Sequence, residues 1–160
     1  MGQGAAKMKM TALIIAMAAG VAVQSTLAAG PLGTAADAKR MLAKAAARYK
    51  AVGRTRALAE FTAETPPFVD RDLYVMCVGA DHLITANGGF PGLVGVTADV
   101  LRDVDGRPLG DAIWNAASTK AEVSVRYAGM NPVSHRSELK TTVFQKVGVD
   151  MCGVGVYDSP

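Results

Sequence analysis

The chain has 160 residues, of which 50% are hydrophobic and 19% are charged, and its formal net charge is +3. A sequence this apolar and this weakly charged folds, which excludes a disordered tail. Its length fits one domain and excludes a large multidomain enzyme.

The N-terminal segment has the pattern of a secretory signal peptide. Lys7 and Lys9 precede the apolar stretch Thr11–Val23, and small residues follow from Ser25 to Gly30. We therefore expect a signal peptide over residues 1–29 and a mature domain over residues 30–160, located in the periplasm or secreted. Retention of the segment as a membrane anchor is the alternative, although a spanning helix needs about 20 apolar residues.

Export also changes how the charges and the cysteines are interpreted. Without Lys7 and Lys9, 15 basic residues face 14 acidic ones, so the basic excess typical of a nucleic-acid-binding protein is gone. Cys77 and Cys152 would mature in an oxidising compartment, where an even count favours a disulfide over two reduced thiols. Neither cysteine lies in a haem or zinc motif. The sequence predicts a structural disulfide, no metal site and no cofactor.

An Ala-rich segment without proline, from Thr34 to Phe61, predicts one long amphipathic helix. Gly53 allows a bend within it, and Pro66-Pro67 ends it. Roughly 28 residues at 1.5 Å each reach about 42 Å, which is longer than a five-stranded sheet is wide. The apolar stripe therefore either packs on the core or, where it overhangs the sheet, forms a homodimer around Met41, Leu42 and Ala45.

The remaining sequence consists of short β-rich runs separated by turn residues. A hairpin is expected from Leu73–Val78 and His82–Ala86. Short helical pieces follow near Ala98–Arg102 and Leu109–Ser118. Three further strands are expected, and these are Glu122–Tyr127, Lys140–Val147 and Met151–Tyr157. Together the elements predict an α+β domain on one antiparallel sheet.

The order of these elements and several local motifs resemble one known family. The motif stretches are Phe68–Val75, Leu93–Gly95, Asp103–Gly110, Val125–Tyr127 with Asn131-Pro132, Glu138 with Lys140, and Cys152–Tyr157. In their order and spacing they resemble a single Cache domain of the small one-lobed type. Such domains are the PAS-like extracytoplasmic sensor modules of bacterial chemoreceptors and histidine kinases. The resemblance covers the chain from Ala36 to Tyr157.

This resemblance implies a long N-terminal helix packed on a five-stranded antiparallel, PAS/profilin-like sheet in the order 2-1-5-4-3. A small ligand cavity is expected on the other face of the sheet, with an organic acid or amine as its ligand. Family motifs carry the ligand contacts to Tyr127, Asn131 and Lys140, and such a trio of donors suits a half-buried carboxylate. Where the family has two tryptophans this chain has Ser124 and Gly129, and Trp114 is the candidate to replace them.

The implied strand order also makes a prediction for the two cysteines. The first and last strands become neighbours at the centre of the sheet, so Cys77 and Cys152 can meet across an antiparallel pair. Alternation then places Leu73, Val75 and Cys77 on one face. The opposite face, with Tyr74 and Met76, also receives two glycines of the last strand, and we expect it to carry the cavity.

The sequence contains no catalytic signature, since a Gly-x-Ser-x-Gly elbow, a His-Glu-x-x-His helix and a phosphate loop are missing. We therefore predict no enzyme. Because the chain ends three residues after Tyr157, we expect a periplasmic small-molecule binding and sensor module without its own transducer, with a membrane-bound receptor as a partner. The alternative is a structural or protein-interaction subunit that keeps the Cache scaffold and binds no ligand.

Overall fold

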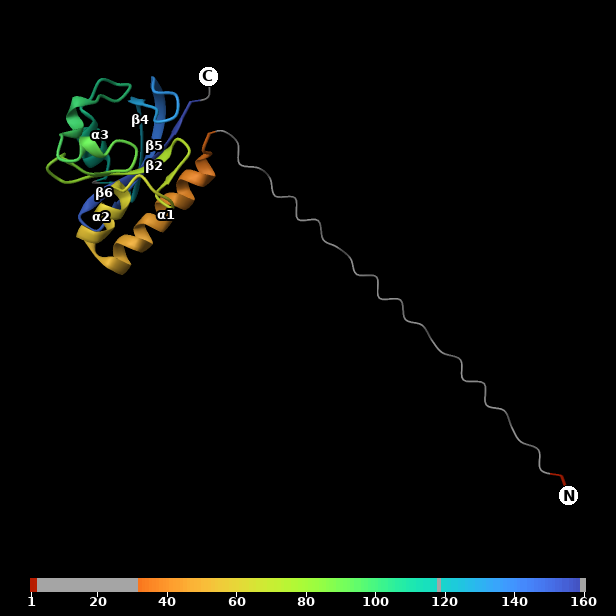
Figure 1. Cartoon of the computed structure of the whole chain (residues 1–160). Coiled ribbons are helices and arrows are strands. Elements are labelled where there is room, and N and C mark those ends of the chain that lie inside the picture. The colour runs from red at the N-terminus through yellow and green to blue at the C-terminus, as the bar shows by residue number, and fades with distance from the viewer. Residues whose placement is uncertain (3–31, 118, 159–160) are drawn as a thin grey trace.

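A computed structural model describes residues 1–2, 32–117 and 119–158 of the chain (Figure 1). The signal peptide predicted over residues 1–29 lies, apart from its first two residues, outside the described residues. Within the described ranges, no helix is both long enough and apolar enough to cross a membrane.

The N-terminal helical segment forms two helices, and the prediction of one continuous helix is wrong. Helix α1 (Ala35–Val52) begins at a capping box in which Thr34 Oγ1 accepts from Asp37 N (3.1 Å) and Asp37 Oδ2 accepts from Thr34 N (3.0 Å). It ends at Gly53, whose φ of 81° lies in the region that favours glycine. Helix α2 (Arg54–Thr62) follows directly.

A buried carboxylate fixes the junction between the two helices. Asp150, at the start of the last strand, accepts hydrogen bonds from Tyr49 Oη (2.8 Å) on α1 and from Arg54 Nε (2.9 Å) on α2. It also accepts from Thr85 Oγ1 (2.9 Å). Burial opposes ionisation of Asp150, but the Arg54 guanidinium and the two hydroxyls outweigh it and lower the pKa of the carboxyl. The helix can therefore end at Gly53 while Asp150 fixes the angle between α1 and α2.

The apolar stripe of α1 packs in the core of its own domain. Met41, Leu42 and Ala45 are buried together with Val75 and Val154 of the sheet. The expectation that these side chains overhang the sheet is therefore wrong, and the homodimer predicted through them has no exposed apolar surface at this position.

The sheet is antiparallel throughout. Its strands are β1 (Val69–Asp70), β2 (Leu73–Val78), β3 (Ile84–Asn87), β4 (Glu122–Met130), β5 (Ser137–Val147) and β6 (Asp150–Tyr157). They follow the order β1-β2-β6-β5-β4, and β3 also pairs with β2. The five predicted strands thus have the predicted neighbours. The sheet has six strands rather than five because the two-residue β1, which no pattern predicted, pairs with the start of β2.

The predicted disulfide lies at the centre of the sheet. Cys77 of β2 and Cys152 of β6 are direct register partners with a Cα–Cα distance of 4.0 Å, and a disulfide joins them. Leu73 and Val75 lie on the same face, against α1 and α2. Tyr74 lies on the opposite face, as the alternation predicted.

That opposite face is covered by short helices and by the chain that connects them. These are η1 (Pro91–Leu93), η2 (Ala98–Val100) and α3 (Leu109–Ala117), close to the positions expected from the sequence. Figure 1 shows α3 on one side of the sheet and the α1–α2 pair on the other. Ile113 of α3 packs against Val123 and Phe144 in the second core cluster.

Candidate ligand-binding site

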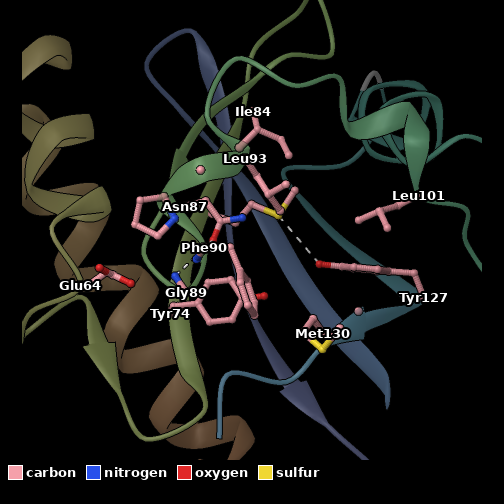
Figure 2. A pocket seen from close by; sticks show the side chains of 14 residues that line it. Glu64, Tyr74, Ile84, Asn87, Gly89, Phe90, Leu93, Leu101, Tyr127 and Met130 are labelled. Carbon is pink, nitrogen blue, oxygen red and sulfur yellow. Dashed lines mark hydrogen bonds between the residues drawn. The ribbon is translucent and has the colours of Figure 1, made fainter. Parts of the chain in front are cut away.

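A cavity of about 680 Å³ opens between the sheet and the chain around η1. Its size is that of a typical small-molecule site. Figure 2 shows Tyr74, Asn87 and Phe90 on one side, with Tyr127 and Met130 facing them. The lining residues are Glu64, Tyr74, Met76, Ile84, Asn87, Gly89, Phe90, Pro91, Gly92, Leu93, Leu101, Tyr127, Gly129 and Met130. Most of this wall is apolar, so it suits the hydrocarbon part of a ligand.

The turn after β3 builds one wall of this cavity. Asn87 Oδ1 accepts hydrogen bonds from Gly89 N (3.1 Å) and Phe90 N (2.9 Å), which turns the chain back over the sheet. Gly89 has to be glycine, because a Cβ there would lie 2.6 Å from the ring of Tyr74. Phe90 then meets the Tyr74 ring edge-on, with centroids 5.9 Å apart. No described residue accepts a hydrogen bond from Asn87 Nδ2, so this amide can still donate.

A buried lysine lies directly behind the cavity wall. Lys140 of β5 is 2% exposed, and its Nζ donates to Tyr74 Oη (3.0 Å) and Tyr157 Oη (3.4 Å). Nζ also lies 4.3, 4.6 and 5.7 Å from the ring centroids of Tyr74, Tyr157 and Tyr127. We call Lys140 and these three tyrosines the lysine cage. Rings at these distances stabilise an ammonium group by cation–π attraction.

Burial dominates the electrostatics of the lysine cage. It lowers the pKa of Lys140 to about 7, and the negative charge of Asp72 opposes the shift only in part. Burial likewise raises the pKa values of the Tyr74, Tyr127 and Tyr157 hydroxyls, which therefore stay protonated and neutral. Among the ion pairs of the described residues, none includes Lys140. The cage holds an amine without a countercharge in contact.

The lysine cage and the cavity share their wall. Tyr74 and Tyr127 belong to both, and Tyr157 Oη donates to the backbone oxygen of Met130, a cavity residue. At Gly129 the wall consists of backbone alone. It is thin at this position, since a Cβ built there would lie 3.3 Å from Lys140 Cδ. The lysine therefore lies one residue layer away from the space that a ligand would fill.

The predicted site residues separate into two groups. Tyr127 of β4 lines the cavity. Lys140, which pairs with Tyr127 in the register of β4 and β5, lies behind the cavity wall. Asn131 closes a turn instead: its Oδ1 accepts from Val133 N (2.8 Å) and its Nδ2 donates to Glu138 Oε2 (2.8 Å). Trp114 of α3 packs against the core cluster on this face. Neither Asn131 nor Trp114 lines the cavity.

The cavity lies on the predicted face, but the glycines of β6 do not create it. The space beside Gly153 is filled by Phe144, and the space beside Gly155 is filled by Lys140, whose Cε would lie 2.3 Å from a Cβ at that position. These glycines make room for the lysine cage. Sequence reasoning missed Asn87, Gly89 and Phe90, whose only signal was an Asn-Gly-Gly turn.

Solved structures of sensor proteins are similar to this fold, among them three from chemosensory or chemotaxis proteins. One is a methyl-accepting chemotaxis protein from Vibrio parahaemolyticus RIMD 2210633, with a TM-score of 0.62 and 14% identity over 76% of this chain and 86% of that chain. Another comes from work on carboxylic acid recognition by a Cache chemosensory domain, with a TM-score of 0.57 and 19% identity over 76% and 86% of the two chains. The third, a periplasmic sensor domain of a chemotaxis protein, has a TM-score of 0.57 and 16% identity over 76% and 88%.

No protein-family model matches the sequence, and no curated protein matches it either. The structural likeness defines the class: an α+β, PAS-like domain with N-terminal helices on an antiparallel sheet. More specifically, the described part of the chain has the fold of a single Cache domain.

Proposed function

We propose that this chain is a periplasmic sensor module that binds a small organic acid in the cavity beside the lysine cage, with no catalytic activity of its own. One observation carries the proposal: Lys140 is buried against hydroxyls and aromatic rings only, next to an apolar cavity. A buried ammonium with no anion in contact is costly, and the charge of Asp72 offsets this cost only in part, so an anionic ligand in contact with Nζ would stabilise it.

The geometry favours an acid whose body is apolar. A carboxylate that replaces the Tyr157 hydroxyl at Lys140 Nζ would gain a charge-assisted hydrogen bond, which is about twice as strong as a neutral one. The hydrocarbon part would then lie between Tyr74, Phe90 and Tyr127, and Asn87 Nδ2 would donate to a second polar group of the ligand. Access to Lys140 would pass Gly129 and the half-exposed Met130, where the wall is thinnest.

The comparisons support this proposal. One similar structure was described for carboxylic acid recognition by a Cache chemosensory domain, and another is a periplasmic sensor domain. A sensor module has to report its occupancy, and we propose a membrane-bound receptor as the partner that receives the signal.

A ligand screen with matched functional groups tests the function. Each hydrocarbon body is offered as acid, amide and amine, for example benzoate, benzamide and benzylamine, to the mature protein in a thermal-shift assay. A ligand at 100 times its dissociation constant stabilises the fold by about 2.7 kcal/mol. We expect shifts with the acids alone.

A pair of variants on one strand gives the control. Lys140→Met should remove the shifts caused by acids and keep the domain folded, whereas Lys146→Met, at an exposed position of the same strand, should leave them unchanged. Shifts that survive Lys140→Met would remove Lys140 from the site. A screen without any shift would favour the alternative, a structural or interaction subunit that binds no ligand.

A further inference from the structure

The lysine cage has a second property, which depends on the proposed function. Lys140 Nζ has two hydroxyl partners and three aromatic rings around it, and it has no contact with a carboxylate of the described residues. In this surrounding the neutral amine is nearly as stable as the ammonium ion, because the charged form is desolvated. An anion placed against the same nitrogen favours only the ammonium ion.

We propose that binding of a carboxylic acid in the cavity is coupled to uptake of one proton by the Lys140 amine, so that the domain responds to the acid and to pH together. The balance is simple. A carboxylate that is already ionised joins a neutral amine and a proton from solvent, and the product is a carboxylate–ammonium pair. No covalent bond changes, and no further reactant is needed.

The other groups that face Lys140 do not supply this proton. Tyr74 of β2, Tyr127 of β4 and Tyr157 of β6 are neutral phenols whose raised pKa keeps them protonated. Asp72, before β2, has one oxygen that accepts from Gly33 N (2.6 Å) and acts on Lys140 only through its charge.

Three further acids lie in the surroundings of the lysine cage. Glu138 of β5 is held by Asn131 and by Ser134 Oγ (2.5 Å), which lowers its pKa and keeps it ionised. Glu64 lies on the cavity wall. Asp111 is in the first turn of α3, which covers the same face, and among the described residues the hydrogen bonds of Lys140 Nζ go to Tyr74 and Tyr157 instead. The group whose pKa burial brings into the neutral range is the lysine itself.

The coupling has a measurable size. The amine should be half protonated near pH 7 in the free protein and fully protonated in the complex. The dissociation constant for the acid should therefore increase about tenfold from pH 6 to pH 8. Proton uptake per bound ligand should rise from about 0.1 at pH 6 to about 0.9 at pH 8.

Calorimetry of the unmodified mature protein measures both quantities. Benzoate, phenylacetate and isobutyrate are titrated at pH 6, 7 and 8 in phosphate and in Tris, whose ionisation enthalpies differ, so the difference in binding enthalpy counts the protons. Binding with the same affinity and no proton uptake at all three pH values would overturn the coupling and leave the proposed function standing. If none of the three acids binds at pH 6, the proposed function fails and the coupling fails with it.

Two variants and one measurement without ligand complete the test. Lys140→Arg keeps its charge throughout this range and should bind the acids without proton uptake, and Lys146→Met should behave as the unmodified protein. If Lys140→Arg does not fold, the ¹³Cε resonance of Lys140, assigned by its loss in Lys140→Met, gives the same answer. It should titrate near neutral pH in the free protein, and a midpoint above pH 9 would overturn the coupling.

Discussion

Replacing Lys140 by methionine should change how the stability of the domain depends on pH. In the unfolded chain this amine has an ordinary pKa of 10.5, whereas burial lowers its pKa in the folded protein to about 7. Between these two values the unfolded state binds more protons than the folded state, so the free energy of unfolding rises with pH. Below pH 7 the amine is charged in both states, and the cost of burying the charge is complete and constant.

The magnitude follows from the two pKa values. Each unit between pH 7 and pH 9 contributes about 1.4 kcal/mol, so the unmodified protein should gain about 3 kcal/mol from this group between pH 6 and pH 9. Lys140→Met has no such group and should lack the gain. At pH 6 the variant should be at least as stable as the unmodified protein, since a buried charge has been replaced by an apolar side chain of similar length.

Urea unfolding followed by far-UV circular dichroism at pH 6, 7, 8 and 9 measures this effect. The relevant quantity is the difference in unfolding free energy between the two proteins at each pH, because all other titrating groups cancel in it. The chain has no third cysteine that could exchange with the disulfide at pH 9. A difference that stays constant from pH 6 to pH 9 would refute the depressed pKa of Lys140 and the burial of the ammonium.

Three further predictions concern the disulfide, the helix junction and the cavity wall. Reduction of the Cys77–Cys152 disulfide, which spans 75 residues, should lower the unfolding free energy by about 4 kcal/mol, and thiol titration of the unreduced, denatured protein should find no free thiol. Asp150→Asn should cost about 2 kcal/mol in urea unfolding because it weakens the charge-assisted hydrogen bonds from Arg54, whose side chain is 47% exposed, and from two hydroxyls, and a cost near zero would contradict the role given to this carboxylate. Gly89→Ala should lower stability by about 1–3 kcal/mol through its clash with a cavity ring, and reduce acid binding. Gly92→Ala, where an added Cβ meets nothing within 4 Å, should leave the stability unchanged.

The fold could largely be predicted because strand patterns and strand order constrain each other. Alternation of side chains along β2 and β6 assigned the two faces of the sheet, and the strand order implied by the Cache resemblance brought Cys77 to Cys152. The sequence allowed a bend at Gly53 but did not predict a complete break, because glycine inside a helix costs only about 1 kcal/mol and many helices tolerate it. The break depends on Asp150, which lies nearly 100 residues further along the chain. Its carboxylate accepts hydrogen bonds from Tyr49 and Arg54, on either side of Gly53.

The candidate site was harder to predict than the fold. Lys140 could be named from a motif, but a lysine on a strand is ordinarily solvated, and its burial depends on close packing against Gly129 and Gly155 of neighbouring strands. Asn131 was expected as a ligand contact, but its contacts are those of a turn residue. Half of the cavity residues lie in the segment from Asn87 to Leu101, and the turn signal at its start does not predict which surface the turn encloses.

The disulfide at the centre of the sheet has a mechanical consequence for the cavity. A covalent bond between direct register partners prevents β2 and β6 from sliding past each other, so Tyr74, Met76 and the residues under them form a rigid floor. The opposite wall, residues 89–101, contains two single-turn 3₁₀ helices, and it is tied to the start of β3 by the Leu83–Thr97 bridge and by backbone hydrogen bonds between Ile84 and residues 95 and 96. The disulfide therefore fixes the β2–β6 floor of the cavity covalently, whereas residues 89–101 are held over it by noncovalent contacts alone.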